Sequence, residues 1–385
     1  MFPNTIIPAL QKFKTPYFFY DFDVLRKTLE EVKKHAIAKD FHVHFALKAN
    51  NQTRILEIIK EAGLGADCVS GGEVNRAIEA GFNPDEIAFA GVGKSDEEIE
   101  LGLKHDIFCF NVESHQEIEV LNEMAGKHGK KAHIALRLNP NVEADTHKYI
   151  TTGLKENKFG INETDLDEVL GMLPRLKNIE LIGIHFHIGS QIQKFTPFEE
   201  LCKKANQLNN YIEDKGFKLT VINVGGGFGI NYDHPNNNSI PDFERFFGLF
   251  KENITLKSHQ KLHFELGRSI VGQCGSLITK VLFTKSGQAK NFAVVDAGMT
   301  ELIRPALYQA THRIDVLTSD KTEKTYDVVG PICESSDTFR KDISIPEVQR
   351  GDLVAIRSAG AYGEVMRSAY NLREANPSIF SDDIK

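Results

Sequence analysis

The stretch Val43–Asn51 reads VHFALKANN, a short apolar run that predicts a buried strand and ends at a lysine. Apolar residues at helical spacing follow over Thr53–Ala62 and predict a helix. In an open doubly wound sheet, a glycine-rich phosphate loop follows the first strand. Because KANN stands there instead over Lys48–Asn51, the stretch favours another parallel α/β fold, and the open sheet is kept as the alternative.

The same strand-and-helix unit recurs along the chain. The eight predicted strands are Val43–Leu47, Ala66–Val69, Ile87–Ala90, Ile107–Val112, Ala132–Leu138, Leu181–His187, Leu219–Val224 and Leu262–Glu265. Strict alternation of strands and helices implies a parallel sheet. Eight units over roughly 220–250 residues match the size of a closed (β/α)8 barrel, which is the predicted fold.

The pattern of predicted secondary structure changes after Gly267. Short β runs and turns replace the helical stretches, which predicts a second, mostly β domain. The β-rich YFFYDFD near the N-terminus is expected to join that domain. The predicted division is therefore a barrel over residues 30–268 and a β domain made of residues 1–29 and 269–385.

Composition excludes several classes of partner. The 385 residues include 53 acidic and 46 basic side chains, a formal net charge of −7, which argues against nucleic-acid binding. Five cysteines are few and odd in number, which fits a reducing compartment. Neither a signal peptide nor an apolar run of about 18 residues is found. We therefore expect a cytoplasmic protein that binds no membrane.

Polar residues gather where the predicted strands end, and in a barrel the active site lies at the carboxyl ends of the strands. These residues are Lys48, Asp67, Asn111, Arg137, His187 and Glu265. A lone lysine there is most simply a strand cap. However, apolar neighbours can lower the pKa of an amine by desolvation, which makes it a nucleophile for a carbonyl. Lys48 is therefore a candidate Schiff-base lysine.

Three further motifs carry possible chemistry. GGGFG over Gly225–Gly229 is weak evidence alone, but barrel phosphate sites favour this loop, and Arg268 in the next loop could bind phosphate. His185 and His187 have the spacing of some metal ligands, so a metal-dependent barrel hydrolase is the alternative of another class. No second histidine pair supports a metal site, and a satisfied structural histidine is favoured for His185. Cys333, in a polar loop, is expected to be accessible.

Taken in order, the motifs resemble the pyridoxal-phosphate decarboxylases of the alanine-racemase-like barrel group, and more narrowly the diaminopimelate decarboxylase family. The motifs are FALKAN, HFHIGSQ, GGGFG, ELGR, RPALY, GPICESSD and AYG, and the resemblance spans about Thr15 to Tyr370. Thr146–Ile161 and Arg304–Tyr308 are specific to that family. They speak against the within-class alternative, a decarboxylase of another basic amino acid or of carboxynorspermidine.

The resemblance implies pyridoxal 5'-phosphate as cofactor and a role for each matching residue. Lys48 would form the Schiff base, His187 would stack on the ring and Glu265 would face the ring nitrogen. The residues expected to hold the phosphate are Ser190, Gly226, Gly227, Gly267, Arg268 and Tyr362. The implied reaction is decarboxylation of meso-2,6-diaminoheptanedioate to L-lysine and CO2, the last step of lysine biosynthesis.

Substrate contacts and assembly follow from the same resemblance. The residues expected to bind substrate are Arg268, Arg304, Tyr308, Glu334 and Tyr362, with Glu334 taking the distal amino group. Cys333 would donate the proton that replaces CO2. In the family, Cys333 and Glu334 reach the site of the neighbouring subunit, which implies a homodimer with shared active sites. Leu266 stands where the family has proline, the C-terminal tail departs from the family pattern, and Asp145–Lys158 is expected to form a mobile loop.

Overall fold

The computed structural model describes residues 2–142 and 158–384 and divides the chain into two compact units. The sheet unit comprises Met1–Thr28, Ile230–Pro241 and Arg268–Lys385, and the barrel unit comprises Leu29–Gly229 and Asp242–Gly267. The expected mobile loop over residues 145–158 lies outside the described residues except at its last position. Among the residues that are described, no helix has the length and apolar character needed to cross a bilayer.

The barrel unit contains a closed ring of eight parallel strands, which confirms the predicted (β/α)8 barrel. Its strands are β2 (His42–Ala46), β3 (Gly65–Cys68), β4 (Ile87–Phe89), β5 (Cys109–Val112), β6 (Ala132–Arg137), β7 (Ile179–His185), β8 (Val221–Asn223) and β9 (Lys261–Leu266). The ring closes where β2 pairs with β9, in a register that places His44 beside Glu265. The carboxyl ends of all eight strands therefore meet at one end of the barrel.

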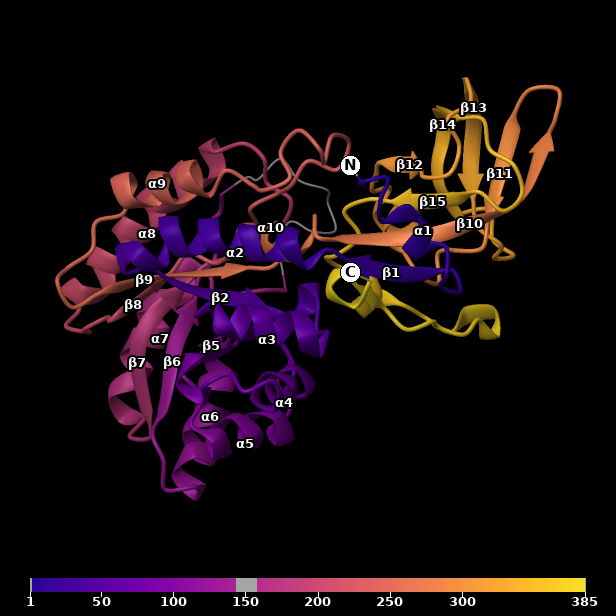
Figure 1. The fold of residues 1–385 in the computed structure, drawn as a ribbon. Coiled ribbons are helices and arrows are strands. Elements are labelled where there is room, and N and C mark those ends of the chain that lie inside the picture. The colour runs from indigo at the N-terminus through magenta and orange to yellow at the C-terminus, as the bar shows by residue number, and fades with distance from the viewer. Residues whose placement is uncertain (1, 143–157, 385) are drawn as a thin grey trace. The chain divides into compact units, whose positions relative to one another are not determined.

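Helices connect the strands and pack along them (Figure 1). They are α2 (Phe22–His35), α3 (Thr53–Glu61), α4 (Gly71–Glu79), α5 (Asp96–His105), α6 (His115–Lys127), α7 (Leu166–Met172), α8 (Thr196–Asp214) and α9 (Phe243–Asn253). Side-chain caps fix where several of them start. Ser70, Ser95 and Ser114 each accept a hydrogen bond from the backbone amide three residues later. Each such cap contributes about 1 kcal/mol, and it sets the turn that leaves the strand end.

The sheet unit is built on one eight-stranded sheet, which confirms the mostly β character predicted for the second domain. Its strands are β1 (Tyr17–Tyr20), β10 (Gly275–Ser286), β11 (Asn291–Val295), β12 (Ile314–Val316), β13 (Glu323–Val329), β14 (Thr338–Pro346), β15 (Leu353–Ile356) and β16 (Ile379–Phe380). Its short helices are α1 (Ile7–Leu10), α10 (Arg268–Val271) and α11 (Arg304–Tyr308). The strand β1 pairs antiparallel with β10 and parallel with β16. Segments near both ends of the chain thus share one sheet.

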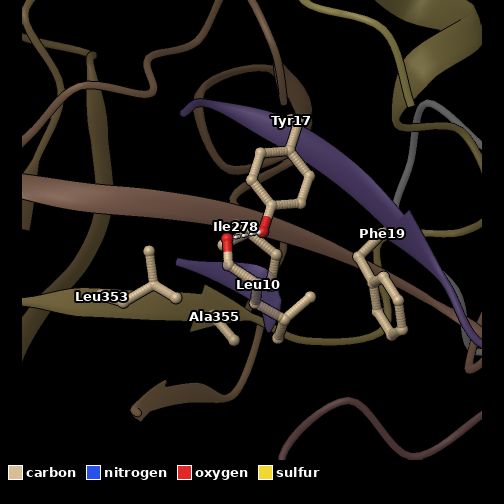
Figure 2. Close-up of a cluster of buried hydrophobic side chains, with 6 residues drawn as sticks. All are labelled: Leu10, Tyr17, Phe19, Ile278, Leu353 and Ala355. Carbon is tan, nitrogen blue, oxygen red and sulfur yellow. Dashed lines mark hydrogen bonds between the residues drawn. The ribbon is translucent and has the colours of Figure 1, made fainter. Parts of the chain in front are cut away.

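The strand β1 is buried along its whole length. Tyr17 and Phe19 pack with Leu10, Ile278 and Leu353 in one apolar cluster, which Figure 2 shows. The Tyr17 hydroxyl donates a 2.7 Å hydrogen bond to the carbonyl oxygen of Leu10. This bond satisfies a polar group that burial would otherwise leave unpaired, so the N-terminal strand is part of the core of the sheet unit.

Candidate active site

Lys48 stands where β2 ends, in the short 3-10 turn Leu47–Ala49. Its Nζ donates a 2.6 Å hydrogen bond to Oδ2 of Asp67, which lies on β3. The Lys48 side chain is 33% exposed, whereas the Asp67 side chain has no exposed surface. Burial and the nearby charge of Glu265 raise the pKa of Asp67, and the Lys48 ammonium offsets part of that rise. The pair therefore presents an accessible amine on a buried carboxylate.

Glu265 on β9 is the charged centre of the barrel interior. Its Oε1 accepts hydrogen bonds from Nδ2 of Asn111 at 3.1 Å and Nδ2 of Asn223 at 2.8 Å. Its Oε2 lies 2.9 Å from Nε2 of His185. Burial raises the pKa of Glu265, but the electrostatic interaction and hydrogen bond with His185, together with the charge of Lys48, outweigh burial and hold that pKa well below its usual range. Glu265 is therefore a fixed carboxylate.

Nε2 of His185 faces Glu265, whereas its Nδ1 is buried and has no hydrogen-bond partner among the described residues. Its Nε2–H is directed at the carboxylate, which accepts only. Within residues 2–142 and 158–384, no group of three or more His, Cys, Asp or Glu side chains is placed to hold a metal ion. The metal-hydrolase alternative therefore gains no support from the described geometry of His185.

His187 lies two residues beyond the end of β7 and contacts the glycine loop of residues 225–229. Its Nδ1 accepts a 3.4 Å hydrogen bond from the backbone N–H of Gly226. Burial lowers the pKa of His187 to about 3, and the charges of Lys48 and Arg137 act in the same direction. The ring is therefore neutral at physiological pH, as is suited to stacking on a planar group.

The glycine loop packs so closely on its neighbours that side chains do not fit. A Cβ on Gly226 would lie 1.8 Å from the carbonyl oxygen of Glu265, and one on Gly225 would lie 2.1 Å from that of Phe186. The loop that carries Ser190 pairs with it, since Ile192 and Gly227 share a 2.9 Å backbone hydrogen bond. Ser190, Gly226 and Gly227 are therefore brought to one edge of the barrel.

Gly267, the last residue of the barrel unit, comes close to the lysine turn. A Cβ there would lie 2.8 Å from Cβ of Ala49. Leu266, at the end of β9, is fully buried. The loop after β9 and the loop after β2 thus meet, as their neighbouring places in the barrel require.

Glu113 is a strand-end residue that the sequence analysis did not single out. Its Oε1 lies 2.7 Å from Nη1 of Arg137, and its Oε2 accepts a hydrogen bond from the N–H of Gly160. The guanidinium of Arg137 also lies over the ring of Phe159 at 4.7 Å. The sequence shows an acidic residue directly after β5. A single carboxylate at a strand end can have many structural roles, so its position alone did not mark Glu113 as a candidate site residue.

The sheet unit brings together two buried arginines around Tyr232. The hydroxyl of Tyr232 accepts a hydrogen bond from Nη1 of Arg268, and the guanidinium of Arg304 lies 4.7 Å from the centre of its ring. Arg268 is also 4.7 Å from the ring of Tyr362. Burial raises the pKa of Tyr232, but the charges and hydrogen bonds of the two guanidinium groups together outweigh burial and lower it. Two cations and two tyrosines therefore lie together in the sheet unit, and guanidinium groups are chemically suited to an anion.

Two residues of this arrangement had no sequence signal. Tyr232 lies in the polar segment of residues 230–241, and His312 lies in a loop before β12. Arg304 reaches His312 at 2.9 Å, and Tyr308 stands at the end of the same helix as Arg304. The RPALY motif therefore forms a helix that places both predicted substrate residues on the sheet unit.

Cys333 and Glu334 form an exposed cluster elsewhere on the sheet unit. The Cys333 backbone N–H donates to Oδ1 of Asn371 at 3.4 Å, and Glu334 Oε1 accepts from the hydroxyl of Tyr370 at 2.9 Å. The cysteine itself is exposed, as expected for a polar loop, while the other four cysteines are buried. These two residues therefore face solvent on the single chain.

Comparisons with known proteins identify the class. Residues 23–272 match the family described as "Pyridoxal-dependent decarboxylase, pyridoxal binding domain". The chain therefore belongs to the pyridoxal-dependent decarboxylases. It is 53% identical to diaminopimelate decarboxylase of Bacteroides thetaiotaomicron, over 98% of both chains. Within the class, the chain belongs to the diaminopimelate decarboxylase family.

A second relative and the solved structures agree. The chain is 42% identical to diaminopimelate decarboxylase of Helicobacter pylori strain J99, over 97% of this chain and 92% of the relative. It is similar to the crystal structure of Helicobacter pylori diaminopimelate decarboxylase complexed with L-lysine. That likeness has a TM-score of 0.90 and 39% identity, and covers 98% of this chain and 94% of the other.

The residues present fit pyridoxal 5'-phosphate, the cofactor of this family. Lys48 offers an accessible amine, Glu265 a buried carboxylate and His187 a neutral ring. The glycine loop has no room for a Cβ on its strand side, so its backbone can approach a phosphate closely. The protein thus offers an amine suited to the aldehyde of the cofactor, a carboxylate suited to its ring nitrogen and a glycine backbone suited to its phosphate.

Proposed function

We propose that this chain converts meso-2,6-diaminoheptanedioate to L-lysine and CO2, as the last step of lysine biosynthesis. The observation that carries the proposal is the pair of buried arginines, Arg268 and Arg304, held around Tyr232. Guanidinium groups in such a setting bind carboxylates. A substrate with an amino-acid group at each end supplies two of them.

The bound cofactor supplies an electron sink for the electrons of the broken carbon–carboxylate bond. We assign Lys48 to hold its aldehyde, His187 to lie against its ring and Glu265 to face its ring nitrogen. We assign its phosphate to Ser190, Gly226, Gly227, Gly267, Arg268 and Tyr362. These assignments are supported by the amine, ring and glycine geometry of the barrel unit and by the position of Arg268 directly after Gly267.

Glu265 has the properties needed to hold a proton on a ring nitrogen. Three donors, from Asn111, Asn223 and His185, fix its position and favour its charged form. A carboxylate held in this way stabilises a cationic ring nitrogen by charge–charge interaction in a site of low dielectric constant. The protein thereby keeps the ring in its electron-withdrawing form.

Recognition of the far end of the substrate needs a cation for the carboxylate and an anion for the ammonium. We assign Arg304 and Tyr308 to the carboxylate, with Arg268 and Tyr362 beside them, and Glu334 to the distal amino group. A substrate such as ornithine has a bare amine at its far end and would need no arginine there. Pairing of buried polar groups gives steep discrimination against substrates that lack one partner, which disfavours decarboxylation of other basic amino acids.

We further propose a homodimer with shared sites, in which Cys333 protonates the reacting carbon after CO2 leaves and Glu334 binds substrate across the interface. Both residues face solvent on one chain, with the apolar side chains of Leu307 and Leu372 also exposed on the sheet unit, Leu372 at 92%. A residue that completes the site of a neighbouring subunit has to be exposed on the single chain. Five free cysteines favour the cytoplasm as the compartment.

Product analysis tests the proposed function. Purified holoprotein is supplied with meso-2,6-diaminoheptanedioate, and L-lysine and CO2 are measured over time, with carboxynorspermidine, ornithine and arginine as competing substrates. Equal amounts of L-lysine and CO2, with far slower release from the other amines, support the proposal. A colourless protein that contains stoichiometric zinc and forms no L-lysine would overturn it.

A further inference from the structure

Arg304 is held from two sides within the sheet unit. It is 5% exposed, its guanidinium faces the ring of Tyr232, and its Nη1 lies 2.9 Å from Nε2 of His312. One edge of this guanidinium is therefore held by protein, while the N–H group at Nε is buried and has no hydrogen-bond partner among the described residues.

The two hydrogen bonds of His312 determine where its proton lies. Its Nδ1 lies 2.8 Å from the carbonyl oxygen of Arg357, and a carbonyl can only accept, so Nδ1 carries the hydrogen. Arg304 can only donate, so Nε2 must offer its lone pair. Only the neutral ring protonated on Nδ1 satisfies both partners. Burial and the charge of Arg304 lower the pKa of His312 to about 3, in agreement with a neutral ring.

We propose that His312 is a positioning residue that aims the Nε edge of Arg304 at the carboxylate on the distal end of the substrate. This inference rests on the proposed function. Arginine side chains have several rotatable bonds, and a bidentate contact to carboxylate requires one orientation of the planar group. The bond from Nη1 to a histidine that is itself fixed to the backbone at Arg357 selects that orientation before the substrate arrives.

The product offers a probe of the distal end alone. L-Lysine retains the carboxylate and the amine of the end that does not react, whereas pentane-1,5-diamine has no carboxylate. A residue that acts only through Arg304 must change the inhibition constant of L-lysine and leave that of the diamine unchanged. A residue needed merely for folding would weaken both inhibitors together.

Two substitutions distinguish the effect of the aromatic ring of His312 from the effect of its hydrogen bonds. His312→Phe keeps the ring against Tyr232 and removes both hydrogen bonds, while His312→Gln retains an acceptor for Arg304. For His312→Phe we expect the KM for meso-2,6-diaminoheptanedioate and the inhibition constant of L-lysine to rise about 10-fold or more, with kcat changed far less. His312→Gln should recover most of the loss. His35→Gln, at a buried histidine on α2 bonded to Glu31, is the matched control.

A double-mutant cycle with Arg304→Lys completes the test. In that background, replacement of His312 should have no further effect on L-lysine inhibition, because the guanidinium it orients is gone. The inference is overturned if folded His312→Phe keeps the wild-type KM, or if L-lysine and the diamine weaken equally. If His312→Phe does not fold, His312→Leu, which also offers Arg304 no acceptor, is judged by the same criterion. Wild-type protein that forms no L-lysine would instead overturn the proposed function.

Discussion

Nζ of Lys48 lies 2.6 Å from Oδ2 of Asp67, and the Asp67 side chain is completely buried. The partner strands β2 and β3 place the two residues side by side, since Ala46 pairs with Asp67. A buried carboxylate next to an amine stabilises the protonated amine. The contact between Lys48 and Asp67 leads to the first prediction.

Asp67→Asn should let the apoprotein capture pyridoxal phosphate at lower pH. Removal of the negative charge favours the neutral amine that attacks the aldehyde, so the midpoint of capture should fall by about 1 pH unit or more. Capture is measured by borohydride reduction followed by mass spectrometry of the adduct between pH 5.5 and 9. The Lys48→Ala variant, which cannot form the adduct, is the negative control. A midpoint pH of capture that is unchanged or higher in Asp67→Asn would contradict the predicted role of Asp67.

Glu265→Gln should lower kcat about 100-fold or more, because a neutral amide cannot hold a proton on the ring nitrogen. Thermal melting is expected to show a folded protein, since the amide still reaches Asn111 and Asn223. Glu180→Gln, at a half-exposed acid on β7, should retain wild-type kcat. Turnover of Glu265→Gln close to wild type would remove this carboxylate from the mechanism.

Gly226→Ala should destabilise the barrel unit by about 3 kcal/mol or more. The added Cβ would lie 1.8 Å from a backbone oxygen of β9, and neither strand can move away without opening the ring. The matched control is Gly248→Ala in α9, where a Cβ meets nothing within 4 Å. That change should instead stabilise by roughly 0.5–1 kcal/mol. Thermal melting of both variants decides, and equal melting temperatures would refute the steric argument.

The neutral state of His312 predicts a dependence of stability on pH. Its pKa in the folded protein is about 3, whereas an unfolded histidine titrates near 6.5. Below pH 6.5 the unfolded chain gains a proton that the folded chain does not, so stability is lost as the pH falls. Between pH 8 and pH 5.5 this histidine removes about 1.4 kcal/mol from the free energy of unfolding. Urea titrations measure the free energy of unfolding at both pH values. Between pH 8 and pH 5.5, the His312→Gln variant should lose about 1.4 kcal/mol less of this free energy than the wild type. Equal losses in the variant and the wild type would contradict the neutral state assigned to His312.

Mixed dimers test the shared site. If Lys48 and Cys333 of one site come from different subunits, a Lys48→Ala chain and a Cys333→Ala chain together restore one complete site per heterodimer. Random reassociation of equal amounts should then recover about a quarter of wild-type activity, although each variant alone is inactive. Heterodimers proven by differential tags but without activity would show that each site is built from a single chain.

The barrel could be predicted from sequence because each strand is a short apolar run followed by an amphipathic helix. The predicted ends of the strands were less accurate than the predicted number and order of the strands. The strand predicted over Leu181–His187 is observed as Ile179–His185, because its start depends on pairing of Ile179 with Ala132 of β6. Local sequence does not reveal that register, and His187 consequently lies in the loop beyond the strand.

The positions of candidate site residues were predictable where polar residues follow the apolar run of a strand, as at Lys48 and Glu265, which lie at the carboxyl ends of β2 and β9. Tyr232 and His312 were missed because their roles arise from contacts with Arg268, Arg304 and the backbone of Arg357, which are distant in sequence or carry no periodic pattern. The strand β16, which the sequence left unassigned, has only two residues and pairs with β1. No local property of either segment indicates that partner.

The place of β1 in the sheet also has a consequence for synthesis on the ribosome. This strand of four buried aromatic residues emerges early, but its partner β10 begins about 250 residues later and β16 only near the C-terminus. At ordinary translation rates, β1 waits on the order of 10–50 s for β10. All eight barrel strands are made during that interval. The nascent chain therefore carries an aromatic strand without its partner strands while the eight barrel strands are made.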